Sequence, residues 1–182
     1  MLGEKTPPEI LQSEVFCRSR KFSFDINRYR LPHGAIAQMG CIRHPGGALA
    51  VPVTQDGQLI LVRQYRFAAE QALLEFPAGT VEVHEPPEAT IRRELEEEAG
   101  YRGHQWRSLG EFYVAPGYSD EIIYAFLATA LEKLDNPPPQ DDDEDIQAVL
   151  MTPTALENAI LQGQVVDAKT ISSFFLARPF LT

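Results

Sequence analysis

Short segments rich in apolar residues make up most of the chain, and turn-forming residues separate them. Two loosely alternating segments, 14–20 and 22–30, are typical of edge strands or hairpins. A Pro-Gly-Gly turn at 45–47 follows them. The later segments that predict strands are 48–54, 58–65, 71–76, 79–83, 106–114, 122–131 and 146–151.

An Asp-Gly pair at positions 56 and 57 lies between the segments 48–54 and 58–65. Asp-Gly between two strand-like segments is a strong signal for a tight hairpin turn. The sequence therefore predicts that these two strands form a hairpin.

Helical periodicity is clearest between Pro86 and Ala99. Ile91, Leu95 and Ala99 recur at every fourth position, which predicts one buried stripe. Proline suits the first helical turn, and Gly100 is suited to a left-handed C-terminal cap. Further helices are predicted at 154–162 and 168–177. Strands mixed with few helices favour an α+β or mixed α/β sandwich.

The length of 182 residues corresponds to about one domain. Apolar residues make up 44% and charged residues 23%, which is ordinary for a soluble globular protein. No stretch reaches the roughly 18 apolar residues of a membrane span, and no signal peptide is recognisable. Cys17 and Cys41 have neither metal nor redox spacing, so we expect a reducing, cytoplasmic setting.

Charge is unevenly distributed along the chain. Residues 1–70 carry 9 basic and 6 acidic side chains, a balance of +3, whereas residues 71–182 carry 7 basic and 20 acidic side chains, a balance of −13; together these give the net charge of −10. Such a chain repels nucleic acid. The acidic half is either a solvated surface or a cation site, and the basic half is suited to an anionic ligand.

Three glutamates crowd the end of the predicted helix. Glu94 and Glu98 are four residues apart and Glu97 is three from Glu94, so like charges share one face. They also lie where the helix dipole disfavours anions. A solvated acidic face is one interpretation. The other is a site for Mg²⁺ or Mn²⁺, because a divalent cation removes both penalties.

Nine specified positions over the 23 residues from Gly79 to Tyr101 decide between these interpretations. They are Gly79, Glu85, Arg93, Glu94, Leu95, Glu97, Glu98, Gly100 and Tyr101. This pattern resembles the box of the Nudix hydrolases, which cleave a nucleoside diphosphate linked to another moiety with divalent cations and water. The resemblance implies an α/β fold, a Nudix-type α/β/α sandwich with a mixed sheet. We expect an N-terminal β-rich dimerisation arm at 1–47 and the Nudix domain at 48–182.

The resemblance also implies roles within the box. Glu94, Glu97 and Glu98 are the expected metal ligands, joined by the backbone carbonyl of Ala78. Arg93 is expected to orient a glutamate of the box, since it stands four residues before Glu97. Glu85 has a structural role, either capping the helix or tying the loop to it.

Residues outside the box resemble the ADP-ribose pyrophosphatase subfamily. The matching segments are 63–66, 75–79 and 116–121, with Pro116 lying 15 residues after Tyr101. Arg66 is expected to bind a phosphate, or to form a surface salt bridge. The resemblance suggests that Arg43 reaches substrate from a partner subunit. Glu75 either binds substrate or is a buried partner of Arg66.

An acidic run occupies residues 141–145. It is not an EF-hand loop, because Ile146 stands where that loop requires glycine. It is either a solvated loop or the loop that in related enzymes carries a glutamate acting as base. Glu144 is the preferred base; Asp142 and, within the box, Glu97 are the alternatives.

The sequence thus predicts Mg²⁺-dependent hydrolysis of ADP-ribose or a related ADP-sugar to AMP and a sugar phosphate. The alternatives are another nucleoside diphosphate sugar such as GDP-mannose, or a silent nucleotide-sensing domain. The intact acidic box argues against the silent domain. We expect a homodimer through residues 1–47, which are too thin to bury a core, and neither nucleic acid nor membrane as a partner.

Overall fold

The computed structural model describes residues 6–140 and 145–181. The chain divides into two compact units. The first comprises Met1–Pro45 and Tyr113–Ile122, and the second comprises Gly46–Phe112 and Ile123–Thr182. The boundary near residue 46 lies close to the expected limit of the N-terminal arm, and the first unit also includes a second, later segment.

The first unit contains a three-stranded antiparallel sheet in the order β1-β2-β3. Its strands are β1 (Glu9–Arg18), β2 (Ser23–Arg30) and β3 (Ile36–Arg43). The sequence predicted the first two approximately, but β1 begins earlier and the third strand was not predicted. β1 is exposed along its whole length, and large apolar side chains such as Phe16, 69% exposed, lie open on the sheet.

The second unit contains two sheets. The first has the order β7-β4-β9-β8, in which β4 pairs parallel with β9 and antiparallel with β7. Its strands are β4 (Gly47–Pro52), β7 (Ala78–Thr80), β8 (Tyr101–Tyr113) and β9 (Ile122–Lys133). The second sheet is antiparallel, with the order β10-β5-β6. Its strands are β5 (Leu59–Arg66), β6 (Gln71–Glu75) and β10 (Ile146–Met151).

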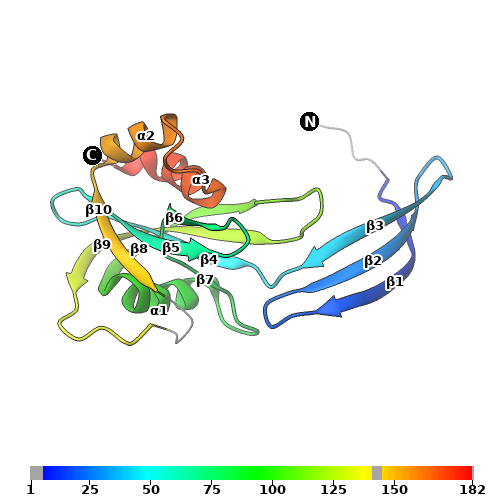
Figure 1. Ribbon diagram of the computed structural model, residues 1–182, viewed down its shortest axis with the longest axis horizontal. Coiled ribbons are helices and arrows are strands. Elements are labelled where there is room, and N and C mark those ends of the chain that lie inside the picture. Colours follow the sequence, from blue (N-terminus) through cyan, green and yellow to red (C-terminus); the bar gives the residue numbers. More distant parts are fainter. Residues whose placement is uncertain (1–5, 141–144, 182) are drawn as a thin grey trace. The chain divides into compact units, whose positions relative to one another are not determined.

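Helices cover the sheets of the second unit on two sides (Figure 1). One side carries α1, and the other carries α2 and α3, followed by a short 3₁₀ turn. Their bounds are α1 (Pro87–Ala99), α2 (Pro153–Leu161), α3 (Ala168–Ala177) and η1 (Arg178–Phe180). This arrangement is the α/β/α sandwich with a mixed sheet that the sequence predicted.

The hairpin predicted around Asp56-Gly57 is wrong in its pairing. The turn forms, with the Gly57 N–H donating to the Thr54 carbonyl at 3.0 Å. However, β4 and β5 belong to different sheets, and the antiparallel pairing ends beside the turn, with the Thr54 N–H donating to the Gln58 carbonyl at 2.9 Å and a bridge between Val53 and Leu59. All six residues of β4 are buried, so it is a central strand that takes β7 and β9 as neighbours.

The helix α1 follows its prediction closely. Ile91, Leu95 and Ala99 form the buried stripe, and the first two are fully inaccessible. Gly100 has the left-handed conformation (φ 73°) and its N–H donates to the Glu96 carbonyl at 3.1 Å. The acidic end of α1 is thereby fixed against the sheet.

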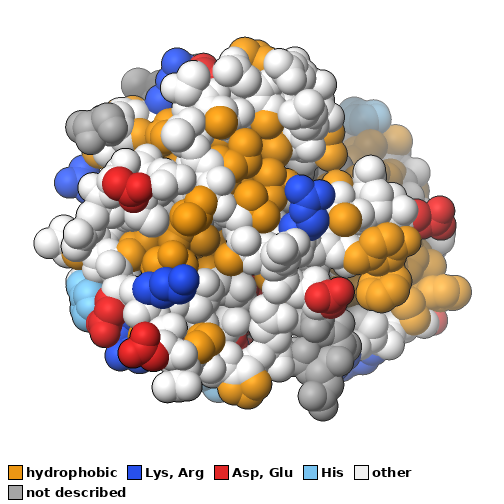
Figure 2. Space-filling view, turned by 60° about the vertical axis from the view of Figure 1, so that its left-hand side comes forward, with side chains coloured by type: hydrophobic (Ala, Val, Ile, Leu, Met, Phe, Trp, Pro, Cys, Tyr) orange, Lys and Arg blue, Asp and Glu red, His pale blue; other side chains and the backbone are white. Residues whose placement is uncertain are grey.

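Apolar side chains also reach the surface of the second unit. Figure 2 shows the side that lies at the left of Figure 1, where hydrophobic side chains gather among uncharged groups and a few charged side chains border them. Exposed examples in the C-terminal part of the chain are Leu161, Phe175 and Phe180. Among the described helices, none is long and apolar enough to cross a membrane.

Candidate active site

The residues of the acidic box meet at the start of β7. The Ala78 N–H donates to Glu98 Oε2 at 3.0 Å, and Glu98 is only 5% exposed. Gly79 follows, and a Cβ at that position would collide with the Glu94 carboxylate. A side chain here would force the Glu94 side chain to move, whereas glycine lets the carboxylate of α1 approach the strand backbone.

Arg93 lies between two glutamates of the box. Its Nη1 is 2.9 Å from Glu94 Oε1 and 2.8 Å from Glu97 Oε2. Partial burial acts to lower the pKa of Arg93, but the charges of Glu94 and Glu97 outweigh it and raise the pKa. The pairing of Arg93 with Glu97 was predicted. The second ion pair, with Glu94, was not. The guanidinium relieves the repulsion between carboxylates that the sequence made evident.

Glu85 ties the preceding loop to the helix. Its Oε2 accepts a hydrogen bond from the hydroxyl of the fully buried Thr90 at 2.7 Å. Of the two structural roles expected for Glu85, this contact corresponds to the second: Glu85 ties the loop that leads from β7 to the helix α1.

The donor set of the box fits a divalent cation by its chemistry. Carboxylates and a backbone carbonyl are the hard oxygen ligands that Mg²⁺ prefers. Within residues 6–140 and 145–181, no three His, Cys, Asp or Glu side chains are grouped so as to hold a metal ion. The described carboxylates are instead compensated by Arg93 and by the Ala78 amide.

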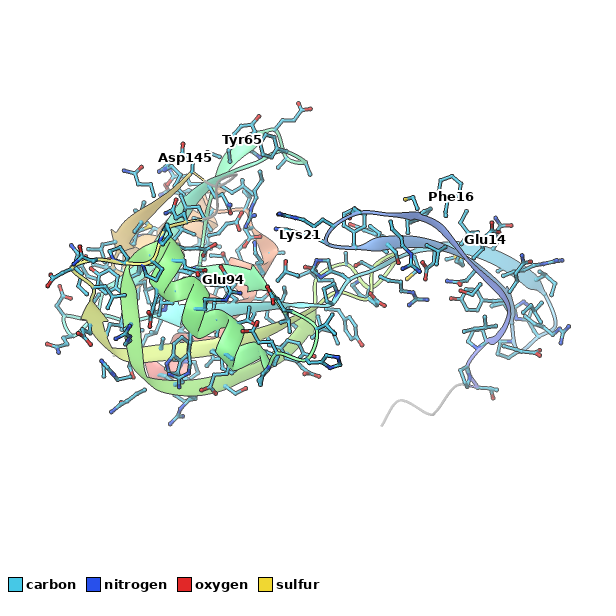
Figure 3. All side chains as sticks on the ribbon, turned by 90° about the horizontal axis from the view of Figure 1, so that it is seen from below. Glu14, Phe16, Lys21, Tyr65, Glu94 and Asp145 are labelled. Carbon is cyan, nitrogen blue, oxygen red and sulfur yellow. The ribbon has the colours of Figure 1, made fainter. Side chains whose placement is uncertain are left out.

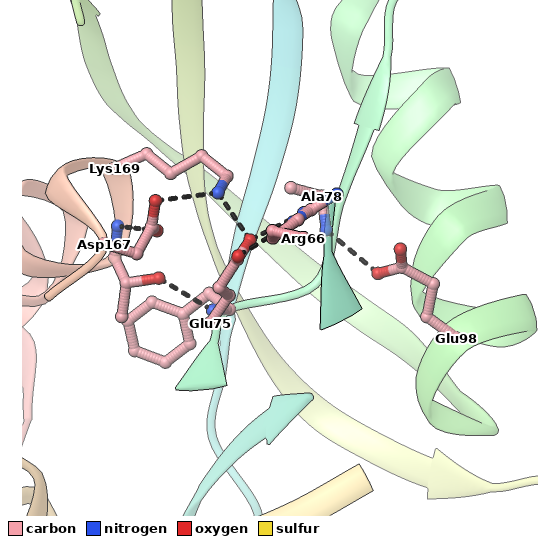
Figure 4. A network of polar contacts seen from close by, with 8 residues as sticks. Arg66, Glu75, Ala78, Glu98, Asp167 and Lys169 are labelled. Atoms are coloured by element: carbon pink, nitrogen blue, oxygen red, sulfur yellow. Dashed lines mark hydrogen bonds and ion pairs between the residues drawn. The ribbon is translucent and has the colours of Figure 1, made fainter. Parts of the chain in front are cut away.

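A buried carboxylate, Glu75, organises a second cluster (Figure 4). Arg66 binds it side-on, through Nε to Oε1 at 2.8 Å and Nη2 to Oε2 at 2.6 Å. Lys169 Nζ lies 2.5 Å from the same Oε2. Glu75 is 1% exposed. Burial acts to raise its pKa, but Arg66 and Lys169 outweigh burial and lower it. Glu75 is thus a buried partner of Arg66, the second of the two expected roles.

The first turn of α3 holds this cluster in place. Asp167 caps the helix by accepting from the Thr170 N–H at 2.9 Å, and it also accepts from Lys169 at 2.9 Å. The Thr170 hydroxyl accepts the Phe76 N–H at 2.9 Å. Sequence reasoning missed Asp167, Lys169 and Thr170, because no spacing linked them to residues more than 90 positions earlier.

Asp145, the last residue of the acidic run, directly precedes β10. Ile146 pairs with Gln64 across the two strands, and Figure 3 shows Asp145 near Tyr65. Glu144 and Asp142, the two bases considered in this run, lie outside the described residues. Glu94, also labelled in Figure 3, lies on α1.

Arg43 and Pro116 belong to the first unit. Arg43 donates from Nη1 to Asp120 Oδ2 at 3.0 Å and from Nε to Asp25 Oδ2 at 3.1 Å. The bond to Asp120 is the largest influence and raises the pKa of Arg43, burial opposes it, and Asp25 adds to the rise. Arg43 is thus held at the end of β3 by two carboxylates.

Comparison with known proteins identifies the family. The NUDIX domain matches residues 43–174, which include the acidic box and the Glu75 cluster. The chain belongs to the Nudix family. Its relatives include an ADP-ribose pyrophosphatase from Bacillus subtilis (strain 168), 34% identical over 169 residues that cover 93% of this chain and 89% of the relative.

Two further similarities extend along nearly the whole chain. A methanol dehydrogenase activator from Bacillus methanolicus is 31% identical over 170 residues, covering 93% of this chain and 92% of the relative. The crystal structure of an ADP compounds hydrolase has a TM-score of 0.85 at 23% identity, covering 98% of this chain and 96% of that one. The structural match establishes the same fold. Membership of the Nudix family is thus confirmed, as the sequence predicted.

The buried pairing of Glu75 makes the stability of this Nudix hydrolase depend on pH. Because its folded pKa is lowered, the stabilisation is present above the unfolded pKa of about 4.3 and is lost as pH falls through the folded value. Glu75→Gln leaves two cations without their buried partner. We expect a loss of about 3 kcal/mol in the free energy of unfolding at pH 7, shrinking as the pH falls below about 4.

Urea denaturation across this pH range measures the effect. Glu88→Gln is the matched control, because Glu88 pairs with Arg92 at 2.8 Å on the exposed face of α1. A surface pair contributes little, so this control should change the stability far less. Equal losses in the two variants at pH 7 would contradict the structural role assigned to Glu75.

Proposed function

We propose that the protein hydrolyses the pyrophosphate bond of ADP-ribose, or of a related ADP-sugar, to AMP and a sugar phosphate, with Mg²⁺ as the metal. The observation that carries this proposal is the acidic end of α1 facing Ala78 and Gly79, with the partly exposed Arg66 in the same unit. Glu98 contributes to raising the pKa of Arg66, so their charges lie within electrostatic reach. The relative from Bacillus subtilis supports the choice of ADP-ribose.

The box residues would hold the metal through their oxygen atoms. Glu94, Glu97, Glu98 and the carbonyl of Ala78 are the proposed ligands. When bound there, Mg²⁺, or Mn²⁺ in its place, supplies neutralisation of the phosphate charge and a more acidic water. Arg93 orients Glu94 and Glu97, and Arg66 binds a phosphate oxygen of the substrate.

Both cysteines are free thiols, Cys17 exposed and Cys41 partly buried. Unpaired cysteines fit a reducing compartment. We therefore place the enzyme in the cytoplasm.

A panel of nucleoside diphosphates tests the substrate and the metal together. With Mg²⁺ we expect the highest kcat/KM for ADP-ribose, with AMP and ribose phosphate as products, and no turnover in excess chelator. Hydrolysis is measured by treating the products with a phosphatase and quantifying the phosphate released. Chromatography identifies the nucleotide product. Faster hydrolysis of GDP-mannose would make GDP-mannose the preferred substrate in place of ADP-ribose. Binding of a nucleotide without hydrolysis of any compound would favour a nucleotide sensor.

Glu98→Gln is the companion variant, because it keeps the shape of the side chain and removes the charge proposed to hold metal. We expect a loss of activity of at least about 100-fold. The melting temperature should not fall, since the repulsion with Glu94 is eased. Glu88→Gln in the first turn of the same helix is the control and should keep its activity. An active Glu98→Gln enzyme would refute the metal assignment.

Glu144 is the proposed general base. Glu144→Gln should lower kcat by about 10²–10⁴-fold with little change in KM, because a base acts in the transition state. Asp145→Asn is the control, since Asp145 directly precedes β10. A loss confined to Asp142→Asn would show that the base is Asp142 and not Glu144. Full activity in all variants of the run would leave Glu97 as the base.

The three-stranded sheet of the first unit supports the proposal of a homodimer formed through residues 1–47. A thin sheet with exposed apolar residues on its strands lacks a core of its own, and Ile10, Phe16 and Met39 are each at least half exposed. In this dimer Arg43 is proposed to reach the partner's substrate.

Light scattering at micromolar concentration should give about twice the chain mass of 20.4 kDa. Phe16→Asp is expected to weaken the dimer, because it places a charge on the proposed apolar interface, whereas Glu14→Gln on the same strand is expected to preserve it. A fully active monomer would contradict both the proposed dimer and the proposed contact of Arg43 with the partner's substrate.

A further inference from the structure

We propose that Lys169 is a positioning residue of the active site: by binding Glu75 it sets the guanidinium of Arg66 so that its outer edge meets a substrate phosphate. This proposal rests on the proposed function. Lys169 acts through Glu75 and Arg66 and itself contacts no substrate.

The side-on pair leaves part of Arg66 available. Glu75 takes the Nε and one Nη2 proton of Arg66, at 2.8 and 2.6 Å. Within residues 6–140 and 145–181, Arg66 Nη1 has no hydrogen-bond partner. The Nη1/Nη2 edge of a guanidinium matches two phosphate oxygens. With 37% of its side chain exposed, Arg66 can present this edge while its inner edge stays fixed.

Lys169 changes how much of the arginine's charge is neutralised. Glu75 Oε2 lies 2.5 Å from Lys169 Nζ and 2.6 Å from Arg66 Nη2, so one oxygen serves both cations. With Asp167 the cluster holds two positive and two negative charges. Without Lys169 the cluster becomes net negative. The Glu75 carboxylate then has Arg66 as its only cation within the cluster and neutralises it more fully. Phosphate binding then loses electrostatic support.

The first turn of α3 also fixes the backbone next to Glu75. Thr170 accepts the Phe76 N–H at 2.9 Å, so the side chain of residue 75 and the amide of residue 76 are held from the same turn. The capping Asp167 in turn holds Lys169 at 2.9 Å. Figure 4 shows these contacts on one side of the segment and Ala78 with Glu98 on the other. The position of Arg66 is therefore set by α3 as well as by its own strand.

Steady-state kinetics with ADP-ribose tests the proposal. Lys169→Met should raise KM about tenfold and leave kcat within about threefold, since phosphate binding is lost equally in the ground and transition states. Lys169→Arg keeps the charge and should restore KM to within about threefold of wild type. Arg178→Met is the control, because Arg178 forms a surface pair with Glu157 just beyond the end of α3. A wild-type KM in Lys169→Met would overturn the proposal.

A double-variant cycle separates action through Glu75 from an independent effect. If Lys169 acts through Glu75, the losses of Lys169→Met and Glu75→Gln are not additive in KM. Additive losses would contradict the proposed route. Lys169→Gln replaces Lys169→Met where the methionine variant does not fold, and it is expected to show the same rise in KM.

A readout without substrate distinguishes this proposal from the proposed function. The carboxyl carbon of Glu75, followed by NMR in an acid titration, reports its pKa directly. Lys169→Met should raise this pKa towards its ordinary value, and an unchanged pKa would overturn the proposal. A wild-type protein that leaves ADP-ribose intact contradicts the proposed function, while this titration separately tests whether Lys169 holds the charge of Glu75, the first step of the proposed route.

Discussion

The burial of one ionised carboxylate, Glu75, constrains the structure around it. A charge removed from water is tolerated only when opposite charges and hydrogen bonds replace its hydration. Arg66 supplies one partner from β5 and Lys169 supplies the other from α3. The sheet β10-β5-β6 and the C-terminal helix must therefore meet at the end of β6. Arg66 is fixed at the same point, so the stability of the fold and, in the proposed function, phosphate binding depend on one ion cluster.

A second electrostatic constraint governs the end of α1. Carboxylates at Glu94, Glu97 and Glu98 repel one another and oppose the helix dipole. Arg93 offsets two of them, and the Ala78 amide holds the third. Three carboxylates thus meet one guanidinium and one amide, so the end of α1 keeps a net negative charge. The helix is thus kept by its buried apolar stripe, while its polar face remains suited to metal binding.

Local patterns explain what the sequence revealed. The stripe of α1, its left-handed cap at Gly100, the strand β10 and the helix α3 follow from periodicity and capping, because those signals lie within one element. The acidic box was evident because its residues fall within 23 positions. The pairing of β4 was not evident: an Asp-Gly turn fixes the direction of the chain but not which strand becomes the neighbour. Lys169 and Thr170 were missed because their partners lie 94 residues earlier.

The five residues from Glu75 to Gly79 join the two electrostatic centres. Glu75 holds Arg66, the Phe76 amide is held by Thr170, and the Pro77 carbonyl accepts the Ala50 N–H of the central strand at 3.0 Å. The Ala78 amide then holds Glu98, and Gly79 leaves the space that Glu94 occupies. Each position has its own contact, so this segment has little freedom to move independently. In the proposed function, this same short length of backbone would position both the substrate phosphate and the metal.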